Sequence, residues 1–265
     1  MPFRIVQSKQ NARLKDLRRA LAHPGREATG LVGIEGPNLL EEAIRAGLRV
    51  DSVFVAQGCE HLLDGLALAA ETELLLLPKE LLDSALSTES PQPVAALVEP
   101  PAWSWADVFQ PNAVPLIVIL AAVQDPGNLG TILRSAEAFG AQAVLSLPGT
   151  VSAWNPKAVR ASAGSLFRLP LLSVSADECF ARLRSEGVKI WTTAVHGAQA
   201  ADRIDLAGPV ALMIGNEGNG VAEALAALAD GAVTIPCPGP VESLNAAVAA
   251  SVLLYEASRQ RRSAQ

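Results

Sequence analysis

Three short polar clusters, each directly after a strand-like apolar run, contain the residue types in this sequence that could do chemistry. They are 125–134 (DPGNLGTILR), 215–218 (GNEG) and 235–245 (IPCPGPVESLN). In an open α/β sheet, ligands bind where strands end and helices begin, because backbone groups and helix N-termini are exposed there. We therefore interpret the three clusters as parts of one active site.

The first cluster combines a glycine-containing turn with an arginine. Gly127 and Gly130 allow the backbone to approach a ligand closely, and the helix expected from Thr131 to Phe139 favours an anion at its N-terminus. Arg134 lies one to two turns into that helix. The alternative is an ordinary glycine-rich turn with an exposed arginine, since the cluster is neither a Walker motif nor a complete Gly-x-Gly-x-x-Gly fingerprint.

The second and third clusters offer backbone groups and few charges. Three glycines within 215–220 favour close contact with a planar ligand, and Glu217 either binds a ribose, positions a catalytic group or is a solvated charge near a helix start.

In the third cluster, the prolines predict a rigid loop and Ser243 is expected to cap a helix. That helix, Leu244–Glu256, is rich in alanine, which permits close approach of a second helix, such as one from another subunit. Asn245, at the expected buried start of this helix, would need hydrogen-bond partners.

Length and composition indicate a folded protein of two domains. The chain has 265 residues, half of them apolar and 18% charged, with a mean hydropathy of +0.27. No run reaches the roughly 18 apolar residues of a membrane span, and no secretion signal is evident, so a cytoplasmic location is expected. The three cysteines are widely spaced without a Cys-x-x-Cys pair, which predicts neither disulfides nor a metal site.

The charge distribution favours a limited contact with nucleic acid. A net charge of −6 argues against a protein that coats nucleic acid indiscriminately. Basic residues nevertheless crowd the first 26 positions, whereas Asp51–Glu99 contains only one base. The N-terminal edge, with Arg13, Lys15 and Arg18, is thus a basic edge on an acidic protein and the candidate for such a contact.

The predicted elements form an α/β protein. The first domain, 1–99, reads as a small α/β sandwich with helices over 8–21, 37–46, 61–70 and 79–86 and strands over 31–35, 53–56, 73–77 and 94–98. Prolines break the pattern and predict a linker at 100–113. The second domain, 114–265, alternates helices with continuous apolar strands over 116–123, 143–147, 190–194, 210–214 and 232–235, which is typical of a mostly parallel sheet.

The three clusters, in this order, resemble the signature motifs of the SpoU (TrmH-like) branch of the SPOUT methyltransferases, which methylate ribose 2′-hydroxyls of RNA. The resemblance spans about 114–262, while 8–18 (SKQNARLKDLR) and 33–36 (GIEG) are similar to the opening of the substrate-binding domain of its ribosomal-RNA members. It implies a parallel sheet with a C-terminal trefoil knot, an S-adenosylmethionine pocket formed by that knot, and a homodimer with the site at the subunit interface.

The resemblance also assigns roles to individual residues. Arg134 activates the ribose hydroxyl, and because the pKa of arginine is very high, we favour stabilisation of the developing alkoxide and binding of the adjacent phosphate over a general-base role. The positions implied to support catalysis are Asn128, Glu217, Ser243 and Asn245. Those implied for the cofactor are Ile214, Gly215, Asn216, Gly218, Ile235, Pro236, Ser243 and Leu244.

With the resemblance, the basic N-terminal edge with Arg13, Lys15 and Arg18 is expected to bind a structured RNA through a limited contact. Three further basic residues are candidates for RNA contact. Lys157 and Arg160 match a family segment that frames the RNA side of the site, although a solvated basic helix is an equal alternative. Arg259, in the C-terminal helix, is expected to reach the phosphate site of a partner subunit; otherwise it is an exposed terminal charge.

The leading hypothesis is an S-adenosylmethionine-dependent RNA 2′-O-ribose methyltransferase, with ribosomal RNA favoured over transfer RNA because of the N-terminal domain. Alternatives within this class are a transfer-RNA methyltransferase and an antibiotic-resistance enzyme acting on ribosomal RNA. From another class comes a non-catalytic RNA-binding or ribosome assembly factor. A nucleotide-binding oxidoreductase is disfavoured because no acidic residue follows the first glycine-rich turn at ribose-binding spacing. Neither a metal nor a membrane partner is expected.

Overall fold

The computed structural model describes residues 2–22, 30–86, 88–241 and 243–263, and the chain divides into two compact units. Unit 1 comprises the chain up to Ala102 together with Trp154–Arg168, and unit 2 comprises Trp103–Ala153 together with the chain from Leu169 onward. This division places residues 103–113, expected to be linker, in unit 2 and residues 154–168 in unit 1. Each unit has its own sheet and core.

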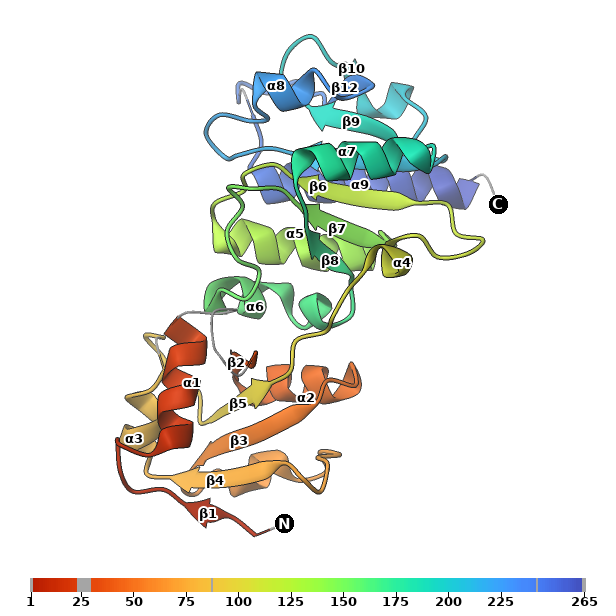
Figure 1. The fold of residues 1–265 in the computed structure, drawn as a ribbon. Coiled ribbons are helices and arrows are strands. Elements are labelled where there is room, and N and C mark those ends of the chain that lie inside the picture. Colours follow the sequence, from red (N-terminus) through yellow and green to blue (C-terminus); the bar gives the residue numbers. More distant parts are fainter. Residues whose placement is uncertain (1, 23–29, 87, 242, 264–265) are drawn as a thin grey trace. The chain divides into compact units, whose positions relative to one another are not determined.

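Unit 1 is built on a five-stranded mixed sheet in the order β1-β4-β3-β5-β2, in which β5 runs antiparallel to both of its neighbours (Figure 1). Its strands are β1 (Arg4–Ile5), β2 (Val32–Glu35), β3 (Val50–Ala56), β4 (Glu73–Leu77) and β5 (Val94–Val98). Its helices are α1 (Ala12–Ala22), α2 (Pro37–Arg45), the 3-10 turn η1 (Glu60–Leu63), α3 (Lys79–Asp83), α6 (Pro156–Ser162) and the 3-10 turn η2 (Ser165–Phe167).

The helix α1 shows why this unit folds. It buries Leu14, Leu17 and Leu21, spaced three to four residues apart, in the core of unit 1. It starts at Ala12 rather than at residue 8, because the side chain of Asn11 accepts a hydrogen bond from the backbone N–H of Leu14 and caps the helix there.

The helix predicted over 61–70 is wrong. Only the 3-10 turn η1 forms, and the backbone becomes extended at Asp64, where ψ is 128°. The leucines of this segment are spaced as in an amphipathic helix, but no residue from 61 to 70 is fully buried. Without a core to pack against, so short a helix gains too little to form.

The segment Trp154–Arg168 belongs to unit 1 because α2 holds it. Gly164 adopts a positive φ of 88°, and a Cβ atom there would lie 2.7 Å from the Cβ of Glu42 on α2. The carboxylate of Glu42 also forms an ion pair with Arg168 at 2.5 Å. Side-chain packing between α6 and β2 completes the attachment.

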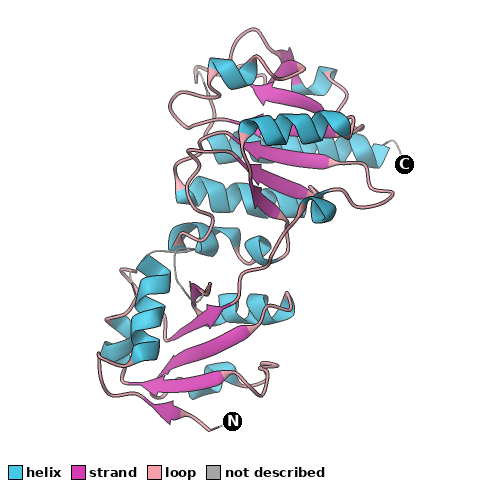
Figure 2. Ribbon diagram, viewed as in Figure 1, coloured by secondary structure: helices cyan, strands magenta, loops and turns pink. Residues whose placement is uncertain are grey.

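Unit 2 is a seven-stranded sheet in the order β10-β12-β9-β11-β6-β7-β8, and all its named strand pairs are parallel (Figure 2). Its strands are β6 (Leu116–Leu120), β7 (Ala143–Ser146), β8 (Leu171–Ser173), β9 (Lys189–Thr193), β10 (Gln199–Ala200), β11 (Val210–Ile214) and β12 (Gly231–Thr234). Its helices are α4 (Trp105–Val108), α5 (Pro126–Ala138), α7 (Ala176–Ser185), the 3-10 turn η3 (Ala201–Arg203), α8 (Glu223–Ala226) and α9 (Ala246–Ser263). The prediction of a large parallel sheet is confirmed, and the trefoil knot stays a prediction.

Helices cover both faces of this sheet. Cys179, Phe180 and Leu183 of α7 pack on one face against Ile117 and Ile119 of β6, and α4 joins the same cluster. On the other face α5 and α9 pack against each other (Figure 1). Strands covered on both sides account for the continuous apolar runs in the sequence. None of the described helices is long and apolar enough to span a membrane.

The end of α9 is fixed by one arginine that the sequence reading did not single out. Arg261 donates hydrogen bonds to the backbone carbonyls of Val114 at 2.7 Å, Pro115 at 2.8 Å and Gly208 at 2.7 Å, and to that of Leu206 at 3.2 Å. Burial lowers the pKa of its guanidinium. The side chain therefore ties the C-terminal helix to the starts of two neighbouring strands, β6 and β11.

We expect Arg261→Ala to lower the free energy of unfolding by roughly 2 kcal/mol or more, because it leaves several carbonyls without their charged donor. Urea unfolding followed by circular dichroism measures this. Arg262→Ala is the matched control, since Arg262 is exposed, and it should change stability by less than about 0.5 kcal/mol. Equal stabilities of the two variants would contradict the anchoring role.

Candidate functional site

The first two clusters meet because β6 and β11 are adjacent parallel strands. Ile214, the last residue of β11, pairs with Leu120, the last residue of β6, so the loops that follow leave the same edge of the sheet. The loop after β6 leads into α5, and the third cluster ends at the start of α9, which packs against α5. The three clusters are thus brought together by sheet register and helix packing.

Glu217 is the centre of a hydrogen-bond network between these loops. Its carboxylate accepts hydrogen bonds from the backbone N–H groups of Asp125 at 3.0 Å and Gln124 at 3.2 Å, and from the side-chain amide of Asn128 at 3.0 Å. Partial burial alone would raise the pKa of Glu217, but these donors outweigh it, and the pKa lies below its usual value. The residue is therefore a fixed anion that organises the loop after β6.

Asn128 and Asn245 extend this network to the third cluster. Asn128 donates from its amide nitrogen to Glu217, and its amide oxygen accepts from Asn245 at 3.0 Å. The oxygen of Asn245 in turn accepts from the backbone N–H groups of Ala247 at 2.9 Å and Val248 at 3.2 Å, which caps α9. One chain of side chains, Glu217–Asn128–Asn245, therefore connects all three clusters.

Two expectations about the third cluster are corrected by this arrangement. The cap of α9 is Asn245 and not Ser243, which is exposed and has no hydrogen-bond partner among the described residues. Asn245 is itself exposed rather than buried, although it is hydrogen-bonded as expected. The helix starts two residues later than predicted, since a cap residue precedes the first helical turn.

The loop after β11 is shaped by close backbone approach. Asn216 donates to the carbonyl of Ala122 at 3.0 Å and accepts from the backbone N–H of Gly218 at 2.9 Å. A Cβ atom on Gly215 would lie 2.2 Å from the carbonyl carbon of Gly220, so only glycine fits there. This loop presents peptide groups instead of side chains.

Arg134 lies on α5, one to two turns beyond Asn128. Its side chain is exposed, and within the described residues it has no hydrogen-bond or ion-pair partner. Asp125, which the sequence reading did not single out as a site residue, fixes the start of the same helix by accepting a hydrogen bond from the backbone N–H of Asn128 at 2.8 Å. An aspartate followed by proline is a signal for a helix start that could have identified it. The arginine is thus a free cation on a firmly held helix.

The positions expected to bind the cofactor provide backbone groups beside apolar side chains. Ile214 is buried, Ile235 and Leu244 are half-buried, and Pro236 is exposed. The backbone N–H groups of Ser243 and Leu244 have no partner within the described part of the chain. This set fits a ligand with a planar apolar ring and several polar atoms.

The candidate RNA residues differ in how free their charges are. Arg13 forms ion pairs with Glu73 at 2.7 Å and Asp51 at 2.8 Å, and its hydrogen bond lowers the pKa of Glu73. Arg259 is paired with Glu256 at 2.7 Å. Lys15 and Arg18, partly buried on α1, and Arg160, exposed on α6, have no ion-pair partner among the described residues, whereas the exposed Lys157 of α6 is not without a partner.

The profile of the SpoU rRNA Methylase family matches residues 115–255, and that of the MRM3-like substrate binding domain matches residues 11–96. The chain belongs to the SpoU family. A curated SpoU relative, the 23S rRNA (guanosine(2553)-2'-O)-methyltransferase RlmP of Bacillus subtilis, is 33% identical over 250 residues, which cover 94% of this chain and 97% of the relative. The family expected from the three clusters is thereby confirmed.

Solved SpoU structures match the whole chain. The SpoU methyltransferase AviRb from Streptomyces viridochromogenes, in complex with AdoMet, superposes with a TM-score of 0.83 at 31% identity, covering 96% of this chain and 99% of that one. The AdoMet-bound rRNA methyltransferase from Sinorhizobium meliloti gives a TM-score of 0.85 at 29% identity, with coverage of 97% and 98%. S-adenosylmethionine is the cofactor of this SpoU family, and the expected cofactor is confirmed.

In this SpoU chain we expect Gly215→Ala to weaken binding of S-adenosylmethionine by roughly tenfold or more, because the added methyl group forces the loop apart. Isothermal titration calorimetry measures the affinity. Gly208→Ala is the control, since a Cβ atom there meets nothing within 4 Å, and it should bind as the parent does. Unchanged affinity in Gly215→Ala would contradict the close-approach argument.

Proposed function

We propose that this SpoU-family protein transfers a methyl group from S-adenosylmethionine to a ribose 2′-hydroxyl of ribosomal RNA. The observation that carries the proposal is the chain Glu217–Asn128–Asn245, which joins the three clusters while Arg134 has no partner in the described part of the chain. The carboxylate of Glu217 accepts its hydrogen bonds from amide N–H groups and not from Arg134. The guanidinium of Arg134 is therefore available to bind an external anion. RNA provides such an anion in its phosphates and in the alkoxide that develops during transfer.

The chemical role of Arg134 follows from its charge. A guanidinium remains protonated at any physiological pH, so it does not act as a general base. It donates hydrogen bonds in a fixed planar arrangement, which stabilises the negative charge that develops on the ribose oxygen and binds the neighbouring phosphate. The bound cofactor supplies the electrophilic methyl group. Asn128 and Asp125 contribute by fixing the helix that carries the arginine.

The cofactor would be held by the loops after β11 and β12 and by the start of α9. Backbone groups of Gly215, Ile235 and Leu244 are suited to the polar atoms of its adenosine and methionine parts, with Ile214 and Pro236 beside the ring. Asn216 and Gly218 shape the first of these loops. Ser243, whose hydroxyl is unused within the described residues, faces either the cofactor or the target nucleotide.

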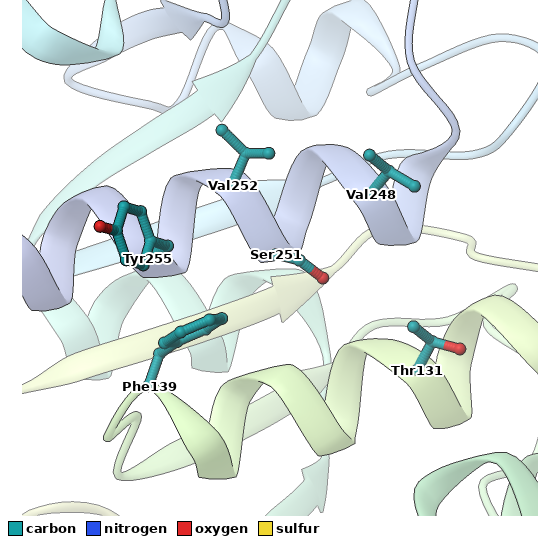
Figure 3. A pocket seen from close by; sticks show the side chains of 6 residues that line it. All are labelled: Thr131, Phe139, Val248, Ser251, Val252 and Tyr255. Atoms are coloured by element: carbon teal, nitrogen blue, oxygen red, sulfur yellow. The ribbon is translucent and has the colours of Figure 1, made fainter.

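We further propose that the active form is a homodimer that uses the exposed face of α9. An apolar groove of about 290 Å³ lies between α5 and α9, lined by Thr131, Phe139, Val248, Ser251, Val252 and Tyr255 (Figure 3). Val248, Val252 and Tyr255 are 48%, 39% and 49% exposed. A contiguous exposed apolar patch on a helix is typical of a protein interface, and a second copy is the occupant implied by the family.

The ribosomal substrate is inferred from unit 1. RlmP, named as a 23S rRNA methyltransferase, matches 94% of this chain, so the similarity includes the substrate-binding unit as well as unit 2. The cations that lack ion-pair partners among the described residues of unit 1 include Lys15 and Arg18, and these are candidate phosphate contacts. A transfer RNA, or a position whose methylation confers drug resistance, is the competing substrate that mapping would reveal.

The test is methyl transfer from labelled S-adenosylmethionine to ribosomal RNA, ribosomal subunits and transfer RNA, with mapping of 2′-O-methylated positions. Arg134→Ala should lower transfer by at least about a hundredfold, since a charged donor to the developing oxyanion is lost, while cofactor affinity is kept. Arg203→Ala, which removes an exposed arginine of unit 2 elsewhere, should leave transfer unchanged. Full activity of Arg134→Ala would overturn the mechanism, and cofactor binding without transfer to any RNA would favour a non-catalytic RNA-binding factor.

A charge placed in the α5–α9 groove should separate the subunits. We expect Val252→Asp to be a monomer by light scattering and to have lost methyl transfer, because burying an unpaired carboxylate in an interface is costly. Leu228→Asp, on an exposed leucine outside the groove, should leave the oligomeric state unchanged. A Val252→Asp protein that remains dimeric and active would exclude this face as the interface.

A further inference from the structure

Glu35, in the 33–36 segment (GIEG), is a buried carboxylate with one unused oxygen. It ends β2 and is only 5% exposed. One oxygen, Oε1, accepts hydrogen bonds from the hydroxyl of Thr88 at 2.7 Å and from the backbone N–H of Gln92 at 2.9 Å. The other oxygen, Oε2, is buried and has no hydrogen-bond partner among the residues that the structure describes.

An unpartnered carboxylate oxygen is an unfavourable feature for a structural residue. Burying it costs free energy unless a donor replaces the lost water. The bonds of Oε1 already explain how Glu35 holds the 88–92 loop, so they leave Oε2 without a structural role. The oxygen is therefore placed to receive a donor that arrives in another state of the protein.

Arg160 is a donor in the same part of unit 1. It lines the same narrow crevice as Glu35, together with Leu21, Gly33, Ile34, Leu39, Pro156 and Val159. Arg160 is exposed, and among the described residues it has neither an ion-pair nor a hydrogen-bond partner. It is the only basic residue among the described residues that line the crevice.

The backbone that carries Arg160 is well fixed within unit 1. Asn155 caps α6 by accepting a hydrogen bond from the backbone N–H of Lys157 at 2.9 Å, and the neighbouring Val159 is buried. Glu42 of α2 holds the far end of the segment through Arg168. Arg160 therefore stands on a fixed backbone beside the crevice that Glu35 also lines.

We propose that Glu35 is a positioning residue for RNA binding: its Oε2 accepts a hydrogen bond from the guanidinium of Arg160 while the outer edge of that guanidinium binds an RNA phosphate. Arginine suits this arrangement because its five N–H donors lie in one plane and serve two acceptors on different edges. The carboxylate fixes the orientation of an otherwise flexible side chain, which lowers the entropy cost of binding the phosphate. This role rests on the proposed function.

The proposal predicts an effect opposite in sign to simple electrostatics. Removing a negative charge beside an RNA-binding surface should by itself strengthen binding to a polyanion. Glutamine has the same shape, so its oxygen still accepts from Thr88 and Gln92, and its NH2 group takes the place of Oε2. If Glu35 positions Arg160, Glu35→Gln weakens binding instead, because this NH2 group is a donor and cannot accept a hydrogen bond from the guanidinium.

The experiment measures affinity of the full-length protein for a 23S ribosomal RNA transcript over a series of salt concentrations, with thermal unfolding of every variant. We expect Glu35→Gln and Arg160→Gln each to weaken binding by about fivefold and the double variant to be no weaker than Arg160→Gln alone. Arg160→Lys keeps the charge but loses the planar fork, and should also weaken binding in a protein with Glu35 intact. Thr88→Val is the matched control, because it removes only the hydrogen bond from the Thr88 hydroxyl to Oε1. This variant should lower stability without changing affinity for RNA.

The outcomes separate this role from the function on which it rests. Additive effects of Glu35→Gln and Arg160→Gln, or tighter binding by Glu35→Gln, would overturn the positioning role even where the wild type binds and methylates RNA. If Glu35→Gln does not fold, unchanged affinity of Arg160→Lys would overturn it. A wild-type protein that binds no RNA would overturn the proposed function and this role together.

Discussion

The site depends on one side-chain amide. Asn128 donates to Glu217 and accepts from Asn245, and since an amide has one donor side and one acceptor side, this pairing fixes its orientation. The two partners come from the loop after β11 and the start of α9, segments separated by many residues. A carboxylate at position 128 would repel Glu217, and an aliphatic residue would leave both partners unpaired. The three clusters therefore form one site through an interaction that only an amide can make with both neighbours.

This arrangement separates the two charged groups of the site. The negative charge of Glu217 is stabilised by neutral donors, two of which are backbone N–H groups, and these donors keep its pKa below the usual value. The carboxylate therefore stays ionised without a cationic partner among the described residues. Arg134 is consequently left without a carboxylate among the described residues. Had the glutamate paired with the arginine, the guanidinium would be occupied before RNA arrived. A similar arrangement occurs in unit 1, where Glu35 accepts hydrogen bonds from neutral donors while Arg160 has no ion-pair partner among the described residues.

The sequence predicted those features that depend on local pattern and missed those that depend on distant contacts. The strands β5 and β11 begin and end where their apolar runs do, since strands buried on both faces are apolar throughout. The helix over 61–70 failed because its leucines have no core to face. The cap of α9 was assigned to Ser243 because serine is a good cap by type, whereas Asn245 is selected by its bond to Asn128, which lies far away in the chain. The role of Arg261 was likewise hidden, because its four acceptors come from two distant segments.

The pairing of charges also explains how an acidic chain can bind RNA. A net charge of −6 gives no general attraction to a polyanion, so affinity has to come from a few cations in defined positions. Arg4, Arg45, Arg49 and Arg259 are engaged by neighbouring carboxylates, and their charge is largely cancelled locally. Lys15, Arg18, Arg134 and Arg160 lack such partners among the described residues, and they stand on helices whose starts are fixed by Asn11, Asp125 and Asn155. Under the proposed function, these cations contact phosphates of a folded RNA, so the shape of the RNA, more than its charge, selects the substrate.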